Sequence, residues 1–466
     1  MTDHDTSSKP GPDSSALAEI LRIAGPSVAA MVSYTLMTFI DKMMVSRIGP
    51  DPIYVGAQGS GGMAAWIPIS FFWGALAIVN TFASQNLGAG KADRAPAYAW
   101  NALWLSVVAW TGMLVYGWFL PEIFHAMGYE PERVRMACDY GQIMVYGSIT
   151  SMAARGFGQF FYGLHRPNIV LVAAIVGNCT NLVLNYLLIF GEWGFPRLEL
   201  RGAAIATVIG AGVEALIPML VFIGPGMNAQ YRTRAAWRPS RTHLREIVVL
   251  GTPAGAMFGN EMICWGFFML YLVGSFGAEA STAGFIAHQW MSLSFMPAVG
   301  LSIAVSSTVG RCMGQKRPDL AARRAYVGLA LGMAYMGICG ALFIIFRGPM
   351  TDLFMPVDTE TAARSRVMEL GSAFLIACAA FQLFDAMAMV LSGALRGAGD
   401  TLWPGVVTIV LSWSIIVGGG LLLREFAPGL GAVGPWIASA SYIILFALAM
   451  LIRFLGGKWR GMSVVH

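Results

Sequence analysis

The stretch LWPGVVTIVLSWSIIVGGGLLL, residues 402–423, holds no charged side chain over 22 positions. At 1.5 Å per residue, a run of this length can cross a bilayer core of about 30 Å as a helix. Lipid offers no partner to backbone N–H and C=O groups, so the segment must satisfy them through its own helical hydrogen bonds. The stretch therefore predicts a transmembrane helix.

Apolar runs of similar length recur along the whole chain of 466 residues. Hydrophobic residues make up 56% of the chain and charged residues only 12%, with a mean hydropathy of +0.63. A soluble domain carries roughly 25% charged residues, and half that share cannot cover a soluble surface. We therefore predict an all-α integral membrane protein. Twelve helices are expected, at residues 18–46, 56–86, 96–120, 134–164, 168–190, 201–225, 244–273, 282–312, 322–346, 367–395, 402–424 and 432–456.

The Lys and Arg residues of the connecting loops predict the orientation of these helices. With both termini in the cytoplasm, 19 of the 30 Lys and Arg residues are cytoplasmic, nine lie on the opposite side and two fall inside helices. An excess of basic residues on one side is the pattern by which membrane proteins set their cytoplasmic face. We expect a multi-pass protein of the plasma (inner) membrane with both termini in the cytoplasm.

Four segments of the first half recur in the second half at nearly constant offset. The pairs are 84–91 with 310–317, Pro26 with Pro253, 162–166 with 392–396, and 202–207 with 434–439. They predict two six-helix bundles related by a parallel internal repeat, an arrangement that suits a transporter whose halves rock about a central cavity. The expected units are a disordered cytoplasmic tail at 1–17, an N-terminal lobe at 18–226, a basic cytoplasmic linker at 227–243, a C-terminal lobe at 244–457 and a cytoplasmic tail at 458–466.

Three acidic residues, Asp41, Glu261 and Asp385, lie inside the expected helices. A carboxylate in hydrocarbon costs several kcal/mol unless it is paired, hydrated or protonated. Such a residue either binds a cation or a proton, or forms a buried salt bridge or an interhelical hydrogen bond. We favour the first interpretation and take the three acids as candidate cation- or proton-binding residues.

Amide and imidazole side chains inside the helices are further candidates for a polar cavity or a gate. Asn178, Asn181 and Asn185 share one face of the fifth expected helix, where an amide stripe either joins helices or lines a cavity. We select Asn178, Asn181, Gln382 and His288 as possible cavity or gating residues. For His288, an interhelical hydrogen bond is the favoured interpretation and a proton relay is the alternative.

Three more charged residues fall inside helices and have competing interpretations. Glu214 is a fourth acid, for which we favour an interhelical hydrogen bond. Arg155 aligns with Asp385 across the repeat, and we favour a plain structural pairing over a role as its counter-charge. Lys42 follows Asp41, but adjacent helical positions point about 100° apart. We therefore expect Lys42 to extend outward rather than to pair with Asp41.

Four parts of the chain carry a family resemblance. They are 39–41 (FID), 84–90 (SQNLGAG), 178–191, and 381–385 (FQLFD) running into 393–401 (GALRGAGDT). Together they resemble the MATE (multidrug and toxic compound extrusion) transporters over nearly the whole chain after Leu17. The acid pair Glu261 and Asp385 is similar to that of the NorM-type branch of the family.

The resemblance implies secondary active efflux of amphipathic organic cations by antiport with H⁺ or Na⁺ through alternating access. It implies that Glu261 and Asp385 form the cation site of the C-terminal lobe and that Asp41 is the acid of the N-terminal lobe. Some NorM-type members carry Tyr where this chain has Phe381. Because that change removes a possible Na⁺ ligand, we favour H⁺ and leave Na⁺ open.

The implied partners are small-molecule organic cations, a monovalent cation and the lipid bilayer. We expect a monomer, with no metal site, no cofactor apart from the coupling ion, and no nucleic acid. A lipid-linked precursor flippase of the same broader superfamily is the alternative function, and it would require a strongly basic cavity. A membrane enzyme is disfavoured because the six histidines are dispersed along the chain.

Overall fold

The computed structural model describes residues 15–49, 53–126, 131–355 and 361–465, and these ranges contain helices and connecting turns but no β-strand. The α-helices are α1 (Ser15–Val45), α2 (Ile53–Ala75), α3 (Ile78–Gly88), α4 (Ala95–Trp118), α5 (Leu120–Ala126), α6 (Pro131–Tyr146), α7 (Ser148–Gly163), α8 (Pro167–Phe190), α9 (Glu199–Ile223), α10 (Pro225–Tyr231), α11 (Arg241–Phe267), α12 (Ala278–Gly314), α13 (Pro318–Ile345), α14 (Arg347–Asp352), α15 (Thr361–Ala398), α16 (Leu402–Leu411), α17 (Gly420–Phe426) and α18 (Val433–Leu455).

Eleven helical segments of the described chain are long and apolar enough to cross a membrane. Two of them each combine two α-helices, because α2 and α3 form one span and α16 continues through a π-helical stretch into α17. The remaining expected helix, 134–164, corresponds to α6 and α7, which are 16 residues each and follow one another across Gly147. The prediction of an all-α membrane fold with twelve helices is thereby confirmed.

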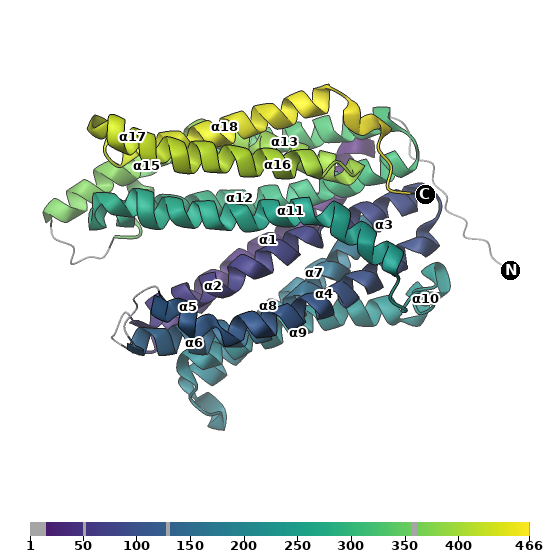
Figure 1. Cartoon of the computed structure of the whole chain (residues 1–466), viewed down its shortest axis with the longest axis horizontal. Coiled ribbons are helices and arrows are strands. Elements are labelled where there is room, and N and C mark those ends of the chain that lie inside the picture. The colour runs from purple at the N-terminus through teal and green to yellow at the C-terminus, as the bar shows by residue number, and fades with distance from the viewer. Residues whose placement is uncertain (1–14, 50–52, 127–130, 356–360, 466) are drawn as a thin grey trace.

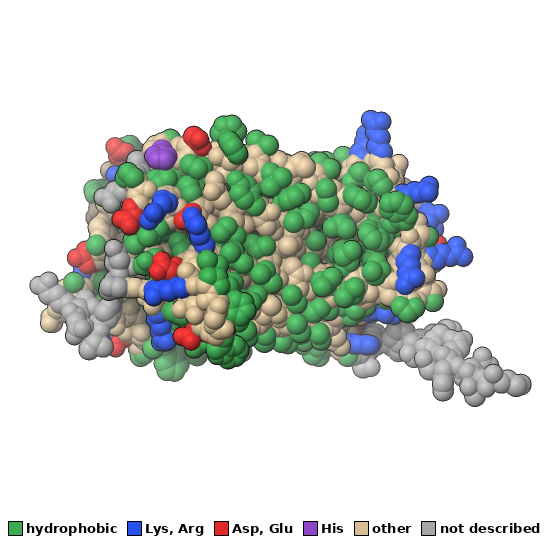
Figure 2. Space-filling view, turned by 90° about the horizontal axis from the view of Figure 1, so that it is seen from below, with side chains coloured by type: hydrophobic (Ala, Val, Ile, Leu, Met, Phe, Trp, Pro, Cys, Tyr) green, Lys and Arg blue, Asp and Glu red, His purple; other side chains and the backbone are tan. Residues whose placement is uncertain are grey.

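The surface agrees with a membrane setting. Figure 2 shows hydrophobic side chains over the middle of one face and charged side chains gathered towards the two ends. On α9, for example, Ile209, Leu216 and Leu220 are all exposed. A soluble monomer rarely exposes contiguous apolar surface of this extent, whereas lipid covers it without cost.

The two halves of the chain form two groups of helices. Figure 1 shows α4–α9 on one side and α11–α18 on the other, with α3 at the end where the C-terminus lies. Across the groups, α1 packs against α12, and α11 packs against α2. Since α1 and α11 open the two repeats, these contacts are equivalent to each other. The repeats are therefore related by an approximate two-fold axis.

The ends of four helices show the same repeat in the backbone. α3 and α12 are followed by the left-handed residues Gly90 (φ +72°) and Lys316 (φ +58°), which occupy equivalent places in the matching segments 84–91 and 310–317. α7 and α15 are followed by the left-handed residues His165 (φ +58°) and Gly399 (φ +98°). His165 and Gly399 are farther apart in the sequence than segments 162–166 and 392–396 are, by about one helical turn. The predicted pairing of those two segments therefore places α7 and α15 one turn out of register.

The two lobes meet in close backbone contact where α3 crosses α12, and we call the contact of α3 and α7 with α12 and α15 the seam. A Cβ atom on Gly88 would clash with the carbonyl of Arg311, and one on Gly314 would clash with the carbonyl of Gln85. The repeat exchanges these two contacts, since Gly88 is equivalent to Gly314 and Gln85 to Arg311. Glycine is needed at both positions because backbone packs directly on backbone.

Hydrogen bonds across the seam follow the same symmetry. The Thr81 hydroxyl of α3 donates to the Arg396 carbonyl of α15 at 2.8 Å. Its counterpart, the Ser307 hydroxyl of α12, donates to the Tyr162 carbonyl of α7 at 2.6 Å. The two donors are separated by the same number of residues as Gly90 and Lys316, and the two acceptors by the same number as His165 and Gly399. Both carbonyls lie in the last turn of a helix, and each uses a second lone pair to accept a bond from the other lobe.

The expected tails and linker fall at this end of the fold. Residues 1–14 of the expected N-terminal tail lie outside the described residues, and Ser15–Leu17 form the first turn of α1. The linker between the lobes includes the end of α10. Towards the C-terminus, Trp459 is buried, and the Val464 backbone N–H donates to the Gln85 side-chain oxygen at 3.0 Å. The last described residues therefore pack on the seam.

Candidate cation and substrate sites

Asp41 of α1 is buried in the N-terminal lobe with both carboxylate oxygens hydrogen-bonded. Gln58 of α2 donates from Nε2 to Oδ2 at 2.8 Å, and Asn185 of α8 donates from Nδ2 to Oδ1 at 2.6 Å. Within the described residues, no Lys or Arg side chain forms an ion pair with Asp41, and Lys42 is exposed as expected. Two neutral amides hold the carboxylate, so its charge is left for a cation or a proton to neutralise.

The amide stripe of α8 continues from Asp41 into the lobe. Asn185 also donates to Asn181 Oδ1 at 3.1 Å, and Asn181 donates to the Thr207 hydroxyl of α9 at 3.3 Å. One turn earlier, Asn178 donates to the Ser33 hydroxyl of α1 at 2.8 Å. The stripe therefore joins α8 to α1 and α9, and it connects the carboxylate to a cavity.

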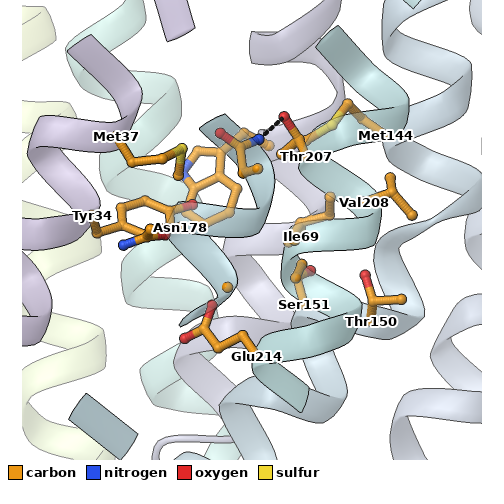
Figure 3. Close-up of a pocket in the computed structure, with 15 residues that line it drawn as sticks. Tyr34, Met37, Ile69, Met144, Thr150, Ser151, Asn178, Thr207, Val208 and Glu214 are labelled. Carbon is orange, nitrogen blue, oxygen red and sulfur yellow. Dashed lines mark hydrogen bonds between the residues drawn. The ribbon is translucent and has the colours of Figure 1, made fainter. Parts of the chain in front are cut away.

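Two adjoining cavities lie inside the N-terminal lobe between α1, α2, α7, α8 and α9. The amide cavity, shown in Figure 3, has about 560 Å³ of empty space including its open mouth, and it is lined in part by Asn178, Asn181 and Thr207. The second, which we call the Glu214–Arg155 cavity, has about 650 Å³ on the same basis. Both cavities share a set of lining residues: Tyr34, Trp66, Ser151, Ala211 and Glu214. The stripe thus does both things considered for it, joining helices and lining a cavity.

Glu214 and Arg155 line the second cavity without forming an ion pair. The interhelical hydrogen bond expected for Glu214 is not found, since no hydrogen bond reaches its carboxylate from the described residues. The Arg155 guanidinium lies 4.0 Å from the centre of the Trp73 ring, and its Nε donates to the Trp73 carbonyl at 3.2 Å. Arg155 is thus held by the N-terminal lobe rather than by Asp385.

In the C-terminal lobe, Glu261 of α11 and Asp385 of α15 lie close enough for the charge of one to act on the other. The Tyr442 hydroxyl of α18 donates to Glu261 Oε1 at 3.2 Å. Within the described residues, Asp385 has no hydrogen-bond or ion-pair partner. Phe381, one turn before Asp385, is fully buried and offers no oxygen. Two acids and one hydroxyl therefore share this site.

The remaining predicted residues of the C-terminal lobe form ordinary hydrogen bonds. Gln382 donates to the Ser294 hydroxyl of α12 at 3.1 Å, while its own side-chain oxygen is buried without a partner among the described residues. His288 Nδ1 lies 3.5 Å from the Ser292 hydroxyl on the same helix, so the interhelical hydrogen bond expected for His288 is not found among the described residues. The structure therefore places these two residues with Glu261 and Asp385 in one lobe, apart from Asp41, Asn178 and Asn181 in the other.

Three contact residues escaped selection from the sequence. Asn185 belongs to the recognised stripe, and its i+4 spacing from Asn181 was a sufficient signal. Gln58 contacts Asp41 from the next helix, and Tyr442 contacts Glu261 from a helix distant in the sequence. Their helices carried no pattern that distinguishes these positions, because the pairing depends on how the helices pack.

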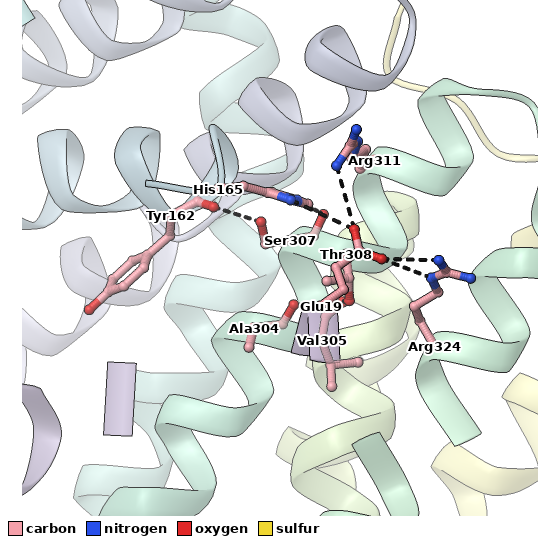
Figure 4. A network of polar contacts seen from close by, with 9 residues as sticks. All are labelled: Glu19, Tyr162, His165, Ala304, Val305, Ser307, Thr308, Arg311 and Arg324. Carbon is pink, nitrogen blue, oxygen red and sulfur yellow. Dashed lines mark hydrogen bonds and ion pairs between the residues drawn. The ribbon is translucent and has the colours of Figure 1, made fainter. Parts of the chain in front are cut away.

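A polar network closes the seam near the start of α1, as Figure 4 shows. Glu19 accepts a hydrogen bond from Arg324 Nη2 of α13 at 3.0 Å and forms an ion pair with Arg311 Nη1 of α12 at 3.5 Å. From the N-terminal lobe, His165 Nδ1 lies 3.8 Å from Glu19, and its Nε2 lies 3.3 Å from the Ser307 carbonyl. The network links both lobes at the end where the seam lies.

Two similar helical bundles, with buried acids in each, define a membrane transporter with an internal repeat. The family model MatE matches this chain twice, at residues 26–187 and 257–418, and the chain therefore belongs to the MatE family of transporters. The two matches agree with the internal repeat. They also confirm the expectation of a transporter rather than an enzyme.

Curated relatives agree with this family. The chain is 31% identical to the "Probable multidrug resistance protein NorM" of Pseudomonas putida, over 95% of this chain and 94% of that protein. It is 30% identical to the protein of the same name from Pseudomonas aeruginosa, over 95% and 89%. The predicted likeness to the NorM-type branch is confirmed.

Solved structures show the same fold. The "Outward-facing conformation of a multidrug resistance MATE family transporter of the MOP superfamily" matches with a TM-score of 0.84 at 21% identity, covering 96% of this chain and 97% of that one. The "eukaryotic MATE transporter AtDTX14" matches with a TM-score of 0.83 at 17% identity, covering 96% of both chains. At these identities the matches support the fold alone.

Proposed function

We propose that this protein is a secondary active multidrug efflux transporter that exports amphipathic organic cations by antiport with H⁺ or Na⁺ through alternating access. The observation that carries the proposal is the set of acids Asp41, Glu261 and Asp385, none of which has a Lys or Arg ion-pair partner within the described residues. The NorM relatives are named multidrug resistance proteins, which supports the proposal that the cargo includes several drugs. We place the protein in the inner membrane with both termini in the cytoplasm.

The acid pair of the C-terminal lobe suits ion coupling. Two carboxylates in a site of low dielectric repel one another, and a bound cation or proton removes much of that repulsion. Glu261 and Asp385 come from α11 and α15, so neutralising them weakens the repulsion between these two helices. Because the pair has no ion-pair partner within the described chain, the bound ion and not a resident Lys or Arg controls that repulsion.

The seam suits alternating access. α3, α12 and α15 meet in backbone-to-backbone contact and are held by the hydrogen bonds of Thr81 and Ser307. The two repeats are related by an approximate two-fold axis, so the lobes can rock as similar bodies. Access from the seam side requires these contacts to part, and access from the opposite side requires them to close.

We favour H⁺ as the coupling ion. Na⁺ is a hard cation that prefers several oxygen ligands, whereas the C-terminal site offers two carboxylates and the single hydroxyl of Tyr442. Phe381 adds no oxygen beside Asp385. A proton needs only one carboxylate.

The flippase alternative finds no support in the cavities of the described residues. A pyrophosphate head group would require a strongly basic cavity. Each cavity that contains an arginine here also contains an acid, since Arg155 is accompanied by Glu214 and Arg396 by Asp400. Neither cavity is therefore strongly basic, as a pyrophosphate head group would require.

The decisive experiment is efflux of a fluorescent organic cation measured in inverted vesicles, with an H⁺ gradient and a Na⁺ gradient imposed separately. We expect uptake to follow the H⁺ gradient in Na⁺-free medium and to stop when that gradient is dissipated. Glu261→Gln and Asp385→Asn should each abolish the coupled transport while the protein still inserts. Normal transport by both variants would contradict the proposal, and transport that requires Na⁺ at constant pH gradient would assign the coupling to Na⁺.

A further inference from the structure

The chain that follows α18 crosses from the C-terminal lobe to the N-terminal lobe. Gly457, in the left-handed conformation (φ +70°), turns the chain back towards the seam. Trp459 then fixes it to the C-terminal lobe, because the ring stacks on Phe454 with centres 4.9 Å apart and Nε1 donates to the Phe454 carbonyl at 2.8 Å. In Figure 1 the yellow chain runs from the end of α18 down to the level of α3. We call residues 460–465 the strap.

Up to the end of α18, the internal repeat accounts for the packing. α18 is equivalent to α9, and the two helices end at equivalent positions. Near these ends, Phe454 packs against Tyr326 and Phe222 packs against Trp100, each with ring centres 5.6 Å apart. This part of the C-terminal lobe therefore belongs to the common structure of the two lobes.

The strap departs from the repeat. Trp459 still has a buried equivalent, Met227, but the buried Val464 stands at the place equivalent to the exposed Arg232. After Met227 the chain stays on its own lobe, where the Thr233 carbonyl accepts a hydrogen bond from α4. The strap is thus an addition to one lobe, and its contacts serve something other than the stability of that lobe.

The buried tip of the strap, Val464, contacts both lobes. Its backbone N–H donates to the side-chain oxygen of Gln85 in α3 at 3.0 Å. Gln85 is fully buried, and its Nε2 donates to the Gly397 carbonyl of α15 at 3.0 Å. A Cβ atom on Gly399, directly after α15, would lie 2.9 Å from Val464 Cγ1. Val464 therefore fills the junction between α3 of one lobe and the end of α15 of the other.

Opening of the seam would separate α3 from α15, so Val464 could stay with only one of them. If it stayed with α15, Gln85 would lose both of its hydrogen-bond partners. If it stayed with α3, its side chain would leave Gly399 and become exposed. Either loss costs free energy in the open state alone. A contact that exists in only one of two conformations shifts the equilibrium towards that conformation.

We propose that the strap is a latch that holds the seam closed and favours the conformation that is open on the opposite side. It acts by adding contacts to one state, without touching Asp41, Glu261 or Asp385. Release of Val464 therefore makes the seam easier to open. The inference rests on the proposed alternating access, and it names a control element of that motion.

The test measures the opening of the seam directly. Asn168 at the start of α8 and Gln315 at the end of α12 are exposed, one on each lobe at the seam end. Asn168→Cys and Gln315→Cys carry nitroxide spin labels, and pulsed electron paramagnetic resonance gives the distances between them. Cys179 and Cys339, the two cysteines that are not buried, are first replaced by alanine. The full-length protein is measured in detergent without substrate or ion gradient.

The strap variants change the tip alone. We expect Val464→Asp to raise the ratio of open to closed distances roughly tenfold, because it removes the burial of one valine side chain from the closed state. Val464→Ala should shift the ratio in the same direction by a smaller factor. Ser463→Asp is the matched control, since it places the same charge at an exposed position whose hydroxyl bonds only within the strap.

The same ratio in Val464→Asp and Ser463→Asp would overturn the inference, as would a shift of Val464→Asp towards the closed distance. If Val464→Asp aggregates on size-exclusion chromatography, Val464→Ala decides the matter. Vesicle transport by the wild type separates this inference from the proposed function. The expected shift in distances without ion-driven transport would refute export and leave the latch standing. Ion-driven transport with distances unaffected at Val464 would refute the latch and leave export standing.

Discussion

At the scale of single residues, Asn185 is the contact on which the Asp41 site most depends. It donates to Asp41 at 2.6 Å and to Asn181 at 3.1 Å, and a hydrogen bond to a charged group contributes about 1.5–3 kcal/mol. We predict that Asn185→Ala lowers the rate of ion-driven efflux roughly tenfold or more. Thr180→Ala is the control, because the Thr180 hydroxyl bonds only to the backbone of its own helix. Equal rates in the two variants would show that the amide has no part in transport.

The acids could be found from the sequence and their partners could not. Asp41, Glu261 and Asp385 were recognisable because a carboxylate inside an apolar run is costly wherever the helix packs. Tyr442 is a different case, since a tyrosine in a membrane helix is common and its hydroxyl is informative only once α18 lies beside α11. For Glu214, another acid inside a helix, the sequence favoured an interhelical hydrogen bond. Only the packing of the helices shows that Glu214 faces a cavity.

At the scale of helices, the glycines of the seam carry the second prediction. A methyl group on Gly88 or Gly314 would clash with a backbone carbonyl of the other lobe, which cannot move as a flexible side chain does. We predict that Gly88→Ala and Gly314→Ala each destabilise the protein by about 1–3 kcal/mol, the usual cost of overpacking. Thermal unfolding of the purified protein should show a lower midpoint for both.

Gly112 of α4 provides the matched control for this prediction. A Cβ atom added at Gly112 would have no other atom within 4 Å. Gly112→Ala should therefore leave the midpoint unchanged or raise it slightly through better helix propensity. A midpoint for Gly88→Ala equal to that of Gly112→Ala would mean that the seam is looser than the contacts indicate.

Helices were predictable where length and apolar content decide, and less so where packing decides. All twelve expected helices are present, because each run must satisfy its backbone within lipid. The sequence does not predict the interruption at Gly147 between α6 and α7. Gly147 lies against Val208 of α9, where a Cβ atom would clash, so the requirement for glycine comes from packing. The one-turn error in pairing α7 with α15 arose because side-chain similarity is a weaker guide than the position of the left-handed residue.

At the scale of the whole molecule, the two lobes are joined by the seam and by two further equivalent contacts, α1 against α12 and α2 against α11. Glu19 near the start of α1 contacts Arg311 and Arg324 of one lobe and His165 of the other. The internal repeat duplicates one contact of this network, because Tyr98 and Glu246 stand at the places equivalent to Arg324 and Glu19 and share a hydrogen bond at 2.8 Å. The other charged partners of Glu19 have no charged equivalents in the repeat. The seam therefore combines a symmetric part made of backbone contacts with an asymmetric part made of charges.

His165 makes this asymmetric part sensitive to pH. It lies in the turn between α7 and α8, where burial and the neighbouring charge of Arg311 lower its pKa from the usual 6.5 to about 4. The groups that face it are Glu19, Arg311, Arg22 and the Ser307 carbonyl. Because the folded pKa is depressed, the unfolded chain binds the proton more readily. The stability due to neutral His165 is thus complete above about pH 6.5 and is lost as the pH falls towards 4.

We predict that acidification from pH 7 to pH 4.5 lowers the thermal midpoint of the wild type more than that of His165→Gln. A pKa difference of this size corresponds to at most about 3 kcal/mol. His125→Gln is the control, since His125 is exposed and remote from the seam. If His165→Gln and the wild type lose stability in parallel over this range, protonation of His165 does not govern the seam. Loss confined to the wild type and to His125→Gln would show that the closed end of the transporter depends on a neutral imidazole.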